Sequence, residues 1–459
     1  MKISFEVNTF LKAFRLAAEA TLGRDVRPIL TQVKIEAGNS GVVLHATTTE
    51  IGIRIRVKCD VAECGTVIVP VKRLIDLLTL IKAGQAVLES DGKTIVVVCG
   101  KQQLTLDVNH PADDFPDVAP FDLASYHCVC IDSMNQLIKR TVPVVEKTGF
   151  QTGCTGVCFN AVGSSLTAVA TDGVRMVQHN VITFVNMSTE PSNSHDIKKV
   201  VVPLKALNLL QRAMREKVML CGDTVVRMGV KADIIMFLCG SVTIFASVQD
   251  ERIPRLAQFK WKEKADCIVD SGILLSAVKR MRIFTTHRYP CTVLTFDRGR
   301  LTLTACGEGV GRCENVVPLT YAGEKKTVKL ECKQLIDMLQ SLTGKVSIYF
   351  SECGSDVVMF TAGSSTCLQG GQKILPEELD KTEWERRETR RQTRRQNAIL
   401  REELAYMKFV LETAIEMDEV DDDEVDVPYL EAKIAELEEK CAALPVDDES
   451  VVIDYADFV

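Results

Sequence analysis

Two stretches of the chain combine residue types that could do chemistry. The glycine-rich stretch GEGVG (Gly307–Gly311) is of a kind that holds a phosphate when it joins a strand to a helix, and Cys154 with Cys158 could supply two ligands to a metal ion. Strand-rich sequence surrounds GEGVG, so we interpret it as a turn. The cysteines have neither a second pair nor a histidine at zinc-ligand spacing to complete a site. We therefore expect no metal, no cofactor and no enzymatic activity.

A strand, often a proline, and an amphipathic helix recur three times along the chain. The three copies are VIVPVKRLIDLL (Val67–Leu78), VVVPLKALNLLQ (Val200–Gln211) and KLECKQLIDML (Lys329–Leu339). In this alignment Lys72, Lys205 and Lys333 are in register, at intervals of 133 and 128 residues. Intervals of this length correspond to whole domains, and a chain of 459 residues is long enough for three.

Each copy is preceded by a second stretch with helical periodicity. These stretches are TFLKAFRLAAEA (Thr9–Ala20), SMNQLIKRTVPVV (Ser133–Val145) and GILLSAVKRMRIF (Gly272–Phe284). Alternating apolar and polar residues around turns predict antiparallel strands in the rest of each unit. We therefore predict an α+β fold with three repeated domains, each with two helices on antiparallel sheets, at residues 1–122, 123–256 and 257–379. A charged helical tail would follow at residues 380–459.

The net charge of −7 averages two unlike segments. Residues 380–459 contain 11 Lys and Arg against 24 Asp and Glu, a net charge of −13, which leaves +6 for residues 1–379. In that basic part the expected helices carry Lys12, Arg15, Lys72, Arg73, Lys139, Arg140, Lys205, Arg212, Lys279, Arg280 and Lys333. Repeated domains can associate in one repeated way and close a ring, and basic helices lining it would suit a sequence-independent grip on DNA phosphates. A merely solvated helix face is the alternative.

The ends of the chain and its cysteines bear on its location. No run of 18 uncharged apolar residues could span a bilayer, and MKISFEVNTF at the N-terminus carries Glu6 where a signal peptide needs apolar residues. Seventeen scattered cysteines are typical of reduced core residues. We expect a cytoplasmic protein without a membrane partner.

Several motifs occur in a co-linear order over residues 1 to about 379. They are RPIL (Arg27–Leu30), HPADDFPDV (His110–Val118), LTAVATDGVRM (Leu166–Met176) and the three strand-to-helix repeats. In this order they resemble the bacterial sliding clamp family, the β subunit of DNA polymerase III. The resemblance implies a head-to-tail dimer that forms a six-domain ring around double-stranded DNA. It also implies DNA polymerase and a clamp loader as partners, a processivity role on nucleoid DNA, and no chemistry.

The resemblance further implies three kinds of site. A partner-peptide pocket between the second and third domains would use Cys154, Thr171, Gly173, Val174, Arg175, Met176, Pro254, Phe259, Leu375 and Pro376. From the residues alone, the ATDG within it is a hairpin turn. Arg24, Lys147 and Gln151 would contact DNA beside the basic helices. Leu104 and Leu106 on one side and Ile283 and Phe284 on the other would form the apolar dimer interface.

The sequence departs from the family at some of these positions. Glu377 and Glu378, in ILPEEL, stand where the family has apolar or basic residues that help to line the pocket, which puts the choice of partner in question. Thr152 and Gly153 stand where aromatic residues often touch DNA, which weakens the DNA-contact assignment there. A clamp-fold scaffold that recruits partners through its tail, without supporting processive replication, is the alternative function.

The tail has its own pattern. Arginines at four-residue spacing, from Arg386 to Arg395, precede an apolar series that starts at Ile399. After the acidic run MDEVDDDEVDVP, helical periodicity returns in Tyr429–Leu444, which could fold back on the first helix as a hairpin. Occupying the clamp's own pocket, binding another protein, binding nucleic acid, and a solvated appendage all remain open. Acidic residues at the end favour protein over DNA as its partner.

Overall fold

A computed structural model describes the protein at residues 1–21, 27–48, 50–81, 84–108, 110–116, 125–146, 155–187, 196–216, 224–248, 259–307, 309–352, 356–372, 393, 396–408, 411 and 427–442. The chain forms two compact units. One comprises Met1–Ala305 with Arg312–Gln372, and the other comprises Cys306–Gly311 with Lys373–Val459. The first unit contains the repeated domains apart from Cys306–Gly311, and the second contains that short segment and the tail.

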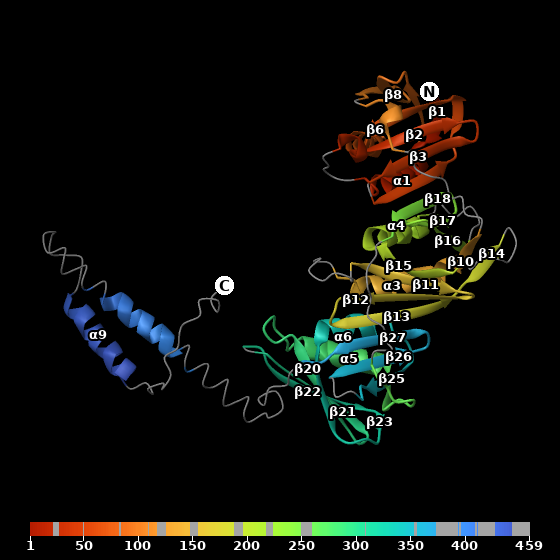
Figure 1. Ribbon diagram of the computed structural model, residues 1–459. Helices are drawn as coiled ribbons and strands as arrows, with labels where there is room; N and C mark the ends of the chain where they lie inside the picture. Colours follow the sequence, from red (N-terminus) through yellow and green to blue (C-terminus); the bar gives the residue numbers. More distant parts are fainter. Residues whose placement is uncertain are drawn as a thin grey trace. The chain divides into compact units, whose positions relative to one another are not determined.

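One order of elements, in which a strand and a helix are followed by five strands, a second helix and three strands, occurs three times in the described residues (Figure 1). We call the sets domain 1 (β1–β9), domain 2 (β10–β18) and domain 3 (β19–β27). Domain 1 consists of β1 (Lys2–Glu6), α1 (Val7–Ala18), the 3₁₀ helix η1 (Pro28–Thr31), β2 (Gln32–Gly38), β3 (Gly41–Thr47), β4 (Ile51–Val57), β5 (Asp60–Glu63), β6 (Gly65–Pro70), α2 (Val71–Leu80), β7 (Gln85–Ser90), β8 (Thr94–Cys99), β9 (Gln102–Asp107) and η2 (Ala112–Asp114).

The other two domains repeat this order. Domain 2 consists of β10 (Ser125–Cys130), α3 (Ile131–Thr141), η3 (Val142–Val144), β11 (Gly156–Val162), β12 (Ser165–Thr171), β13 (Arg175–Ile182), β14 (Phe184–Met187), β15 (Ile197–Pro203), α4 (Leu204–Arg215), β16 (Val225–Lys231), β17 (Ile234–Cys239) and β18 (Val242–Ser247). Domain 3 consists of β19 (Cys267–Asp270), α5 (Ser271–Arg282), β20 (Cys291–Asp297), β21 (Arg300–Gly307), β22 (Gly311–Pro318), β23 (Thr320–Tyr321), β24 (Lys326–Glu331), α6 (Cys332–Leu339), β25 (Lys345–Phe350), β26 (Val357–Ala362) and β27 (Ser365–Gly370).

Local chemistry sets where the helices begin and end. The Glu6 carboxylate accepts the backbone N–H groups of Asn8 and Thr9 at 3.1 and 2.6 Å, and thereby caps α1. Such caps contribute about 1 kcal/mol because they satisfy N–H groups that have no partner inside the helix. Helix α3 ends at Thr141, although the helical pattern of the sequence extends to residue 145. It ends there because Pro143 in the following 3₁₀ turn has no N–H group to donate to a helical hydrogen bond.

Two nine-stranded sheets are shared between neighbouring domains. The β14-β10-β16-β17-β18 layer of domain 2 continues through an antiparallel β18–β4 pair into the β4-β3-β2-β6 layer of domain 1. The β15-β11-β12-β13 layer of domain 2 continues through the β13–β27 pair into the β27-β26-β25-β19-β23 layer of domain 3. The remaining sheets, β5-β1-β7-β8-β9 and β22-β21-β20-β24, each belong to a single domain.

The core lies between the helices and these layers. Helix α1 packs on β3 and β4, α3 packs on β12 and β13, and the two helices of each domain touch each other. The apolar faces meet in one continuous cluster of buried side chains that runs through all three domains. Phe159 and Phe237, for example, pack edge to face at 6.3 Å between ring centroids in domain 2. Each domain of about 130 residues is long enough to bury apolar side chains, and here the buried side chains of neighbouring domains join into one core.

The predicted α+β fold of repeated two-helix domains is therefore confirmed. Lys72, Lys205 and Lys333 are each the second residue of a helix, in α2, α4 and α6, as the alignment of the repeats requires. The proposed boundaries at 122/123, 256/257 and 379/380 all fall outside the described residues, so their positions stay predictions.

The second unit contains two tail helices, one over residues 396–408 and α9 (Val427–Ala442). An ion pair of 2.5 Å between Lys408 Nζ and Glu438 Oε1 joins them. Ile434 and Leu437 on α9 are buried, at 8% and 2% exposure. The described part of the tail is thus helical, and the two helices described there contact each other, as the sequence pattern indicated. The arginine rows up to Arg395 lie outside the described residues.

Candidate functional site

The hairpin between β12 and β13 holds most of the described residues predicted for the peptide pocket. Thr171 Oγ1 donates to the Arg175 carbonyl at 2.8 Å and accepts the Gly173 N–H at 3.1 Å. Asp172 Oδ1 accepts the N–H groups of Val174 and Arg175 at 3.1 and 2.9 Å. Gly173 has a φ of +88°, which a residue with a side chain rarely adopts. Side-chain bonds inside the turn therefore fix the backbone of this hairpin.

The Arg175 side chain ties this hairpin to domain 3. Its Nε donates to Asp172 Oδ2 at 2.7 Å, and its Nη1 lies 3.3 Å from both the Gln334 carbonyl and Asp337 Oδ2 on α6. Its Nη2 donates to the Pro143 carbonyl at 3.1 Å. With these partners and 10% side-chain exposure, Arg175 forms a contact between domains 2 and 3 at the predicted pocket.

The other predicted pocket residues are exposed to different extents. Val174 is 49% exposed, whereas Thr171 and Met176 are buried, and Met176 is paired with Leu368 across the β13–β27 strands. Phe259 is partly exposed, and its ring lies 5.9 Å from that of Trp261. The structure thus brings Thr171 and Gly173–Met176 together, and it records no contact of Phe259 with them. Cys154, Pro254, Leu375, Pro376, Glu377 and Glu378 lie outside the described residues.

Two sets of basic residues occupy equivalent places in all three domains. Lys72, Lys205 and Lys333 stand in the first turn of the second helix. Arg15, Lys139 and Lys279 are each the ninth residue of the first helix. A cation in the first turn of a helix is disfavoured by the helix dipole by roughly 0.3–1 kcal/mol. Helix stability therefore does not account for the first set, and an anionic partner would.

The predicted DNA-facing cations divide into engaged and available groups. Arg212 forms an ion pair with Glu19, Arg15 donates to Thr79 Oγ1 at 2.8 Å, and Lys205 Nζ donates to the Thr21 carbonyl at 3.4 Å. Arg280 faces the Asn315 side chain, and Arg140 is bound at the junction of domains 2 and 3. Among the described residues, no ion pair engages the exposed side chains of Lys12, Lys72, Arg73, Lys139, Lys279 and Lys333. Arg24, Lys147, Gln151, Thr152 and Gly153 lie outside the described residues.

Arg140 belongs to a polar cluster that the sequence did not predict. Its Nη1 lies 3.1 Å from Nδ1 and 3.2 Å from Nε2 of His179, and it donates to Ser365 Oγ at 3.0 Å. Burial, and then the neighbouring Arg140, lower the pKa of His179 to about 4, while burial lowers the pKa of Arg140. His179 is therefore neutral near pH 7, so it can accept from the guanidinium. Aligning the repeats could have revealed this cluster, because domain 1 has Ile55 where domain 2 has His179.

Residues predicted for the dimer interface lie at or near open sheet edges. Leu104 and Leu106 are on β9, which pairs with β8 on one side and with no described strand on the other. Leu104 is 40% exposed. In domain 3, Ile283 follows α5 and is 69% exposed, while Phe284 packs partly against the core. Strand β22 of this domain is also an edge strand, which lies beside β21 on one side and beside no described strand on the other.

The two stretches that suggested chemistry have ordinary structural settings. GEGVG joins β21 to β22, so a strand follows it where a phosphate-binding loop would lead into a helix. Burial raises the pKa of the Cys158 thiol to about 11, which disfavours the thiolate that metals bind; Cys154 lies outside the described residues. In the part of the chain that is described, no group of three or more His, Cys, Asp and Glu side chains could hold a metal ion.

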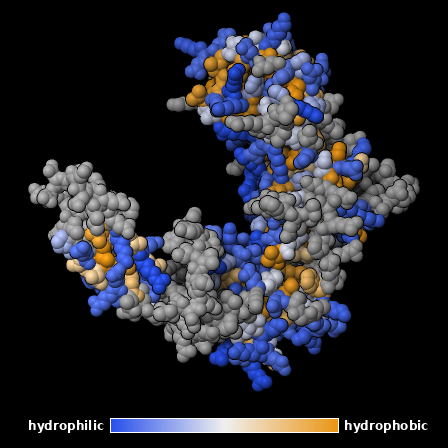
Figure 2. Space-filling model, turned by 60° about the vertical axis from the view of Figure 1, so that its left-hand side comes forward, coloured by the Kyte–Doolittle hydropathy of each residue, from blue (hydrophilic) through white to orange (hydrophobic). Residues whose placement is uncertain are grey.

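The tail helices expose apolar side chains as well as charges. Ile399 and Tyr406, seven residues apart on the first helix, are 62% and 66% exposed. Figure 2 shows hydrophobic surface on the tail helices at the left of the view, among hydrophilic side chains. No helix among the described residues is long and apolar enough to cross a membrane.

Comparison with known proteins places these features in one family. The family models for the N-terminal and central domains of the DNA polymerase III beta subunit match residues 1–119 and 129–255, together more than half of the chain. The Beta sliding clamp of Chlamydia muridarum is 25% identical over 315 residues, which are 68% of this chain and 82% of that protein. The Beta sliding clamp of Pseudomonas aeruginosa is 23% identical over 366 residues, or 79% and 96% of the two chains.

Solved structures agree in fold. A sliding clamp (DNA polymerase III subunit beta) from Pseudomonas aeruginosa, bound to griselimycin, has a TM-score of 0.71 at 22% identity and covers 82% of this chain and 100% of that chain. The Caulobacter crescentus pol III beta structure has a TM-score of 0.71 at 20% identity, with the same coverage. At these identities the structural likeness shows the fold alone.

Proposed function

This chain belongs to the DNA polymerase III beta subunit family, the sliding clamps, and from that premise we propose that two copies close head to tail into a ring around duplex DNA. As a sliding clamp it is a processivity factor, which tethers a polymerase by encircling the template instead of by reading its sequence. Such a ring would work in the cytoplasm on nucleoid DNA, and a clamp loader would open it.

Sheet topology is the observation that carries the ring. Within the chain, the last strand of domain 2 (β18) pairs with β4 of domain 1, and the last strand of domain 3 (β27) pairs with β13 of domain 2. Strand β9 is equivalent to β18 and β27, and β22 is equivalent to β4 and β13. Among the described strands, these two have no such partner. Pairing β9 of one copy with β22 of another would repeat the same junction, and applying it twice closes a ring.

Apolar surface near both edges supports this pairing. Leu104 on β9 is 40% exposed, and on the other side Val316 on β22 and Ile283 beyond α5 are 56% and 69% exposed. An open strand with exposed apolar side chains attracts another strand, and proteins usually cover or charge such edges. Burying these side chains between two copies would stabilise the ring by about 25 cal/mol per Å² of apolar surface removed from water.

The basic helices supply the proposed grip on DNA. Lys72, Lys205 and Lys333 occupy equivalent helical positions in three domains, and a dimer would present each position twice. Long, exposed ammonium side chains bind phosphates as point charges without fixing a register, which suits a clamp that must slide.

We place the partner-peptide site at the β12–β13 hairpin. Val174 offers exposed apolar surface on a turn whose backbone is fixed by Thr171 and Asp172. A rigid turn with a small apolar surface suits an anchor residue of a short peptide, because little freedom is lost on binding. Polymerases and repair proteins that carry such peptides are the expected partners.

The test is the native molar mass of the full chain and of two variants. We expect a dimer for the wild type, a monomer for Leu104→Arg, and a dimer for the control Val162→Arg, because Val162 is 48% exposed on β11 of domain 2, which contains neither edge strand. A dimer that survives Leu104→Arg would reject β9 as the interface. A wild-type monomer at micromolar concentration would favour the clamp-fold scaffold that recruits partners through its tail.

A further inference from the structure

The two internal junctions of the body are built on one plan but with different chemistry. The β4–β18 pairing sets Ile55 opposite Val242, and the β13–β27 pairing sets His179 opposite Ser365 at the equivalent register. All of Leu16, Ile55 and Val242 are buried and apolar. Arg140, equivalent to Leu16, joins His179 and Ser365 in the polar cluster described above. At the junction of domains 2 and 3, a guanidinium, an imidazole and a hydroxyl therefore stand at the positions that apolar side chains occupy at the junction of domains 1 and 2.

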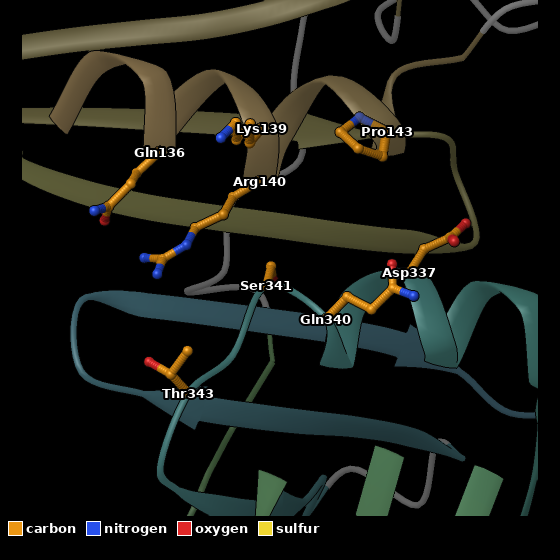
Figure 3. A pocket seen from close by; sticks show the side chains of 8 residues that line it. All are labelled: Gln136, Lys139, Arg140, Pro143, Asp337, Gln340, Ser341 and Thr343. Carbon is orange, nitrogen blue, oxygen red and sulfur yellow. The ribbon is translucent and has the colours of Figure 1, made fainter. Parts of the chain in front are cut away.

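The helices at these junctions differ in the same way. At the first junction, Glu19 beyond α1 forms an ion pair with Arg212 of α4. The equivalent residues at the second junction are Pro143 and Gln340, which cannot form one. A recess of about 310 Å³ opens between α3 and the end of α6, and both residues line it. Figure 3 shows the Arg140 side chain leaving α3 toward the segment after α6, which carries Ser341 and Thr343.

The charges around the recess are unbalanced. Arg140 has no carboxylate within ion-pair distance among the described residues, and Lys139 beside it is exposed and equally unpaired. Asp337 is the one acidic residue that lines the recess, and Arg175 from the neighbouring hairpin engages its carboxylate at 3.3 Å.

Helix ends reduce this positive charge without cancelling it. Both α3 and α6 end at the recess, and each C-terminus contributes about half a negative charge. The two helix C-termini together would thus offset about one of the two positive charges of Lys139 and Arg140. A net positive charge of about one remains in the recess, where the Arg140 guanidinium is partly buried. A partly buried cation without a counter-ion is costly, and an anion in the recess would remove that cost.

We propose that this recess binds a phosphate group. Lys139 and Arg140 would supply the charge, and the Gln340 amide and the Thr343 hydroxyl would donate hydrogen bonds to the remaining oxygens. The Ser341 hydroxyl already donates to the Met338 carbonyl at 2.6 Å, so it does not donate to the ligand. The volume is at the small end of the range for ligand sites. The phosphate can belong to a nucleic-acid backbone or to a free phosphate compound, and the site does not depend on ring closure.

The test measures binding of inorganic phosphate to the full chain by calorimetry, at constant ionic strength set with chloride. We expect saturable binding that is weakened at least tenfold in Thr343→Glu, which places a carboxylate in the recess, and weakened much less in the matched Thr343→Gln, whose neutral amide can still donate a hydrogen bond. Lys139→Gln should also weaken binding, whereas Lys279→Gln, at the equivalent position of domain 3, should not. Absence of saturable binding, or equal losses in Lys139→Gln and Lys279→Gln, would overturn the proposal, because general surface charge would then explain the attraction.

A second arm identifies the source of the phosphate. Duplex DNA affinity is measured for the same lysine variants at several salt concentrations. A larger loss of DNA affinity for Lys139→Gln than for Lys279→Gln supports a backbone phosphate in the recess. Equal losses of DNA affinity, when only Lys139→Gln has weakened the binding of inorganic phosphate, support a free phosphate compound. The native mass of each variant is measured in parallel, so that a failure of dimerisation is recognised separately from a failure of the recess.

Discussion

Arg175 Nη1 lies 3.3 Å from Asp337 Oδ2, and this contact joins the β12–β13 hairpin of domain 2 to helix α6 of domain 3. The same guanidinium also binds Asp172 and two backbone carbonyls. A residue that sequence resemblance assigned to peptide binding thus also holds two domains together. The nearby Val174 is free to meet a partner.

Arg175→Ala should lower the free energy of unfolding by about 2–4 kcal/mol, because it leaves Asp172 and two carbonyls without their donor. Asp337→Ala should cost no more than about 1 kcal/mol, since that carboxylate is 33% exposed. Chemical denaturation of both variants measures the difference. Equal effects would mean that the Asp337 contact carries the junction alone.

Val174→Glu should abolish binding of a peptide with an apolar anchor and leave the free energy of unfolding nearly unchanged, since the side chain is 49% exposed. Val174→Thr, which keeps the size, is the control and should lose only part of the affinity. Fluorescence anisotropy with a labelled polymerase peptide measures both. Unaltered binding in Val174→Glu would move the pocket away from this hairpin.

Stability should depend on pH through His179. Burial and the neighbouring Arg140 hold its pKa at about 4, whereas in the unfolded chain the imidazole takes up a proton near pH 6.5. The full stability is therefore present above about pH 6.5 and declines as the pH falls toward 4, by up to about 3 kcal/mol. His179→Gln should flatten this part of the profile, and His287→Gln, at an exposed histidine, should not.

Replacing Lys72, Lys205 and Lys333 together with Gln should weaken DNA binding and lower the slope of log affinity against log salt by up to about three. The same change should slightly raise stability, because it removes cations from helix N-termini. Salt titration of duplex binding and thermal unfolding measure the two effects. The control replaces three exposed lysines outside the helices, Lys93, Lys101 and Lys264.

Leu437→Ala should unfold the tail helices while leaving the body intact. Leu437 is 2% exposed, and truncating it lowers the free energy of unfolding by about 2–5 kcal/mol. This loss exceeds the stability expected of a pair of short helices. Hydrogen exchange should show lost protection on α9 and unchanged protection in β1–β27. Ile399→Ala, at a side chain that is 62% exposed, should change neither.

The sequence predicted what periodicity encodes. The three repeats, the helical position of Lys72 and its equivalents, the turn at Asp172–Gly173 and the helical tail follow from patterns within one segment of chain. Helix bounds were off by a few residues where a proline or an acidic cap, such as Pro143 or Glu6, ended or began the helix.

Contacts between domains were beyond the reach of those patterns. Arg140 and Arg212 lie on basic helix faces and were predicted to face DNA, yet one binds His179 and the other pairs with Glu19. A helical pattern states which face is polar, and not which neighbouring domain that face meets. The sharing of sheets through β18–β4 and β13–β27 was also not predicted, since alternation marks a strand without naming its partner.

The shared sheets also determine how the body can be divided. A cut between domain 1 and domain 2 would separate β4 from β18. Each strand would then expose backbone N–H and C=O groups that pair with the other strand in the intact chain. The resulting fragments would tend to aggregate, because the cut also divides the continuous apolar core. For the same reason, unfolding of one domain would remove the strand that pairs with the edge of its neighbour. We therefore expect the three domains to unfold cooperatively in one transition.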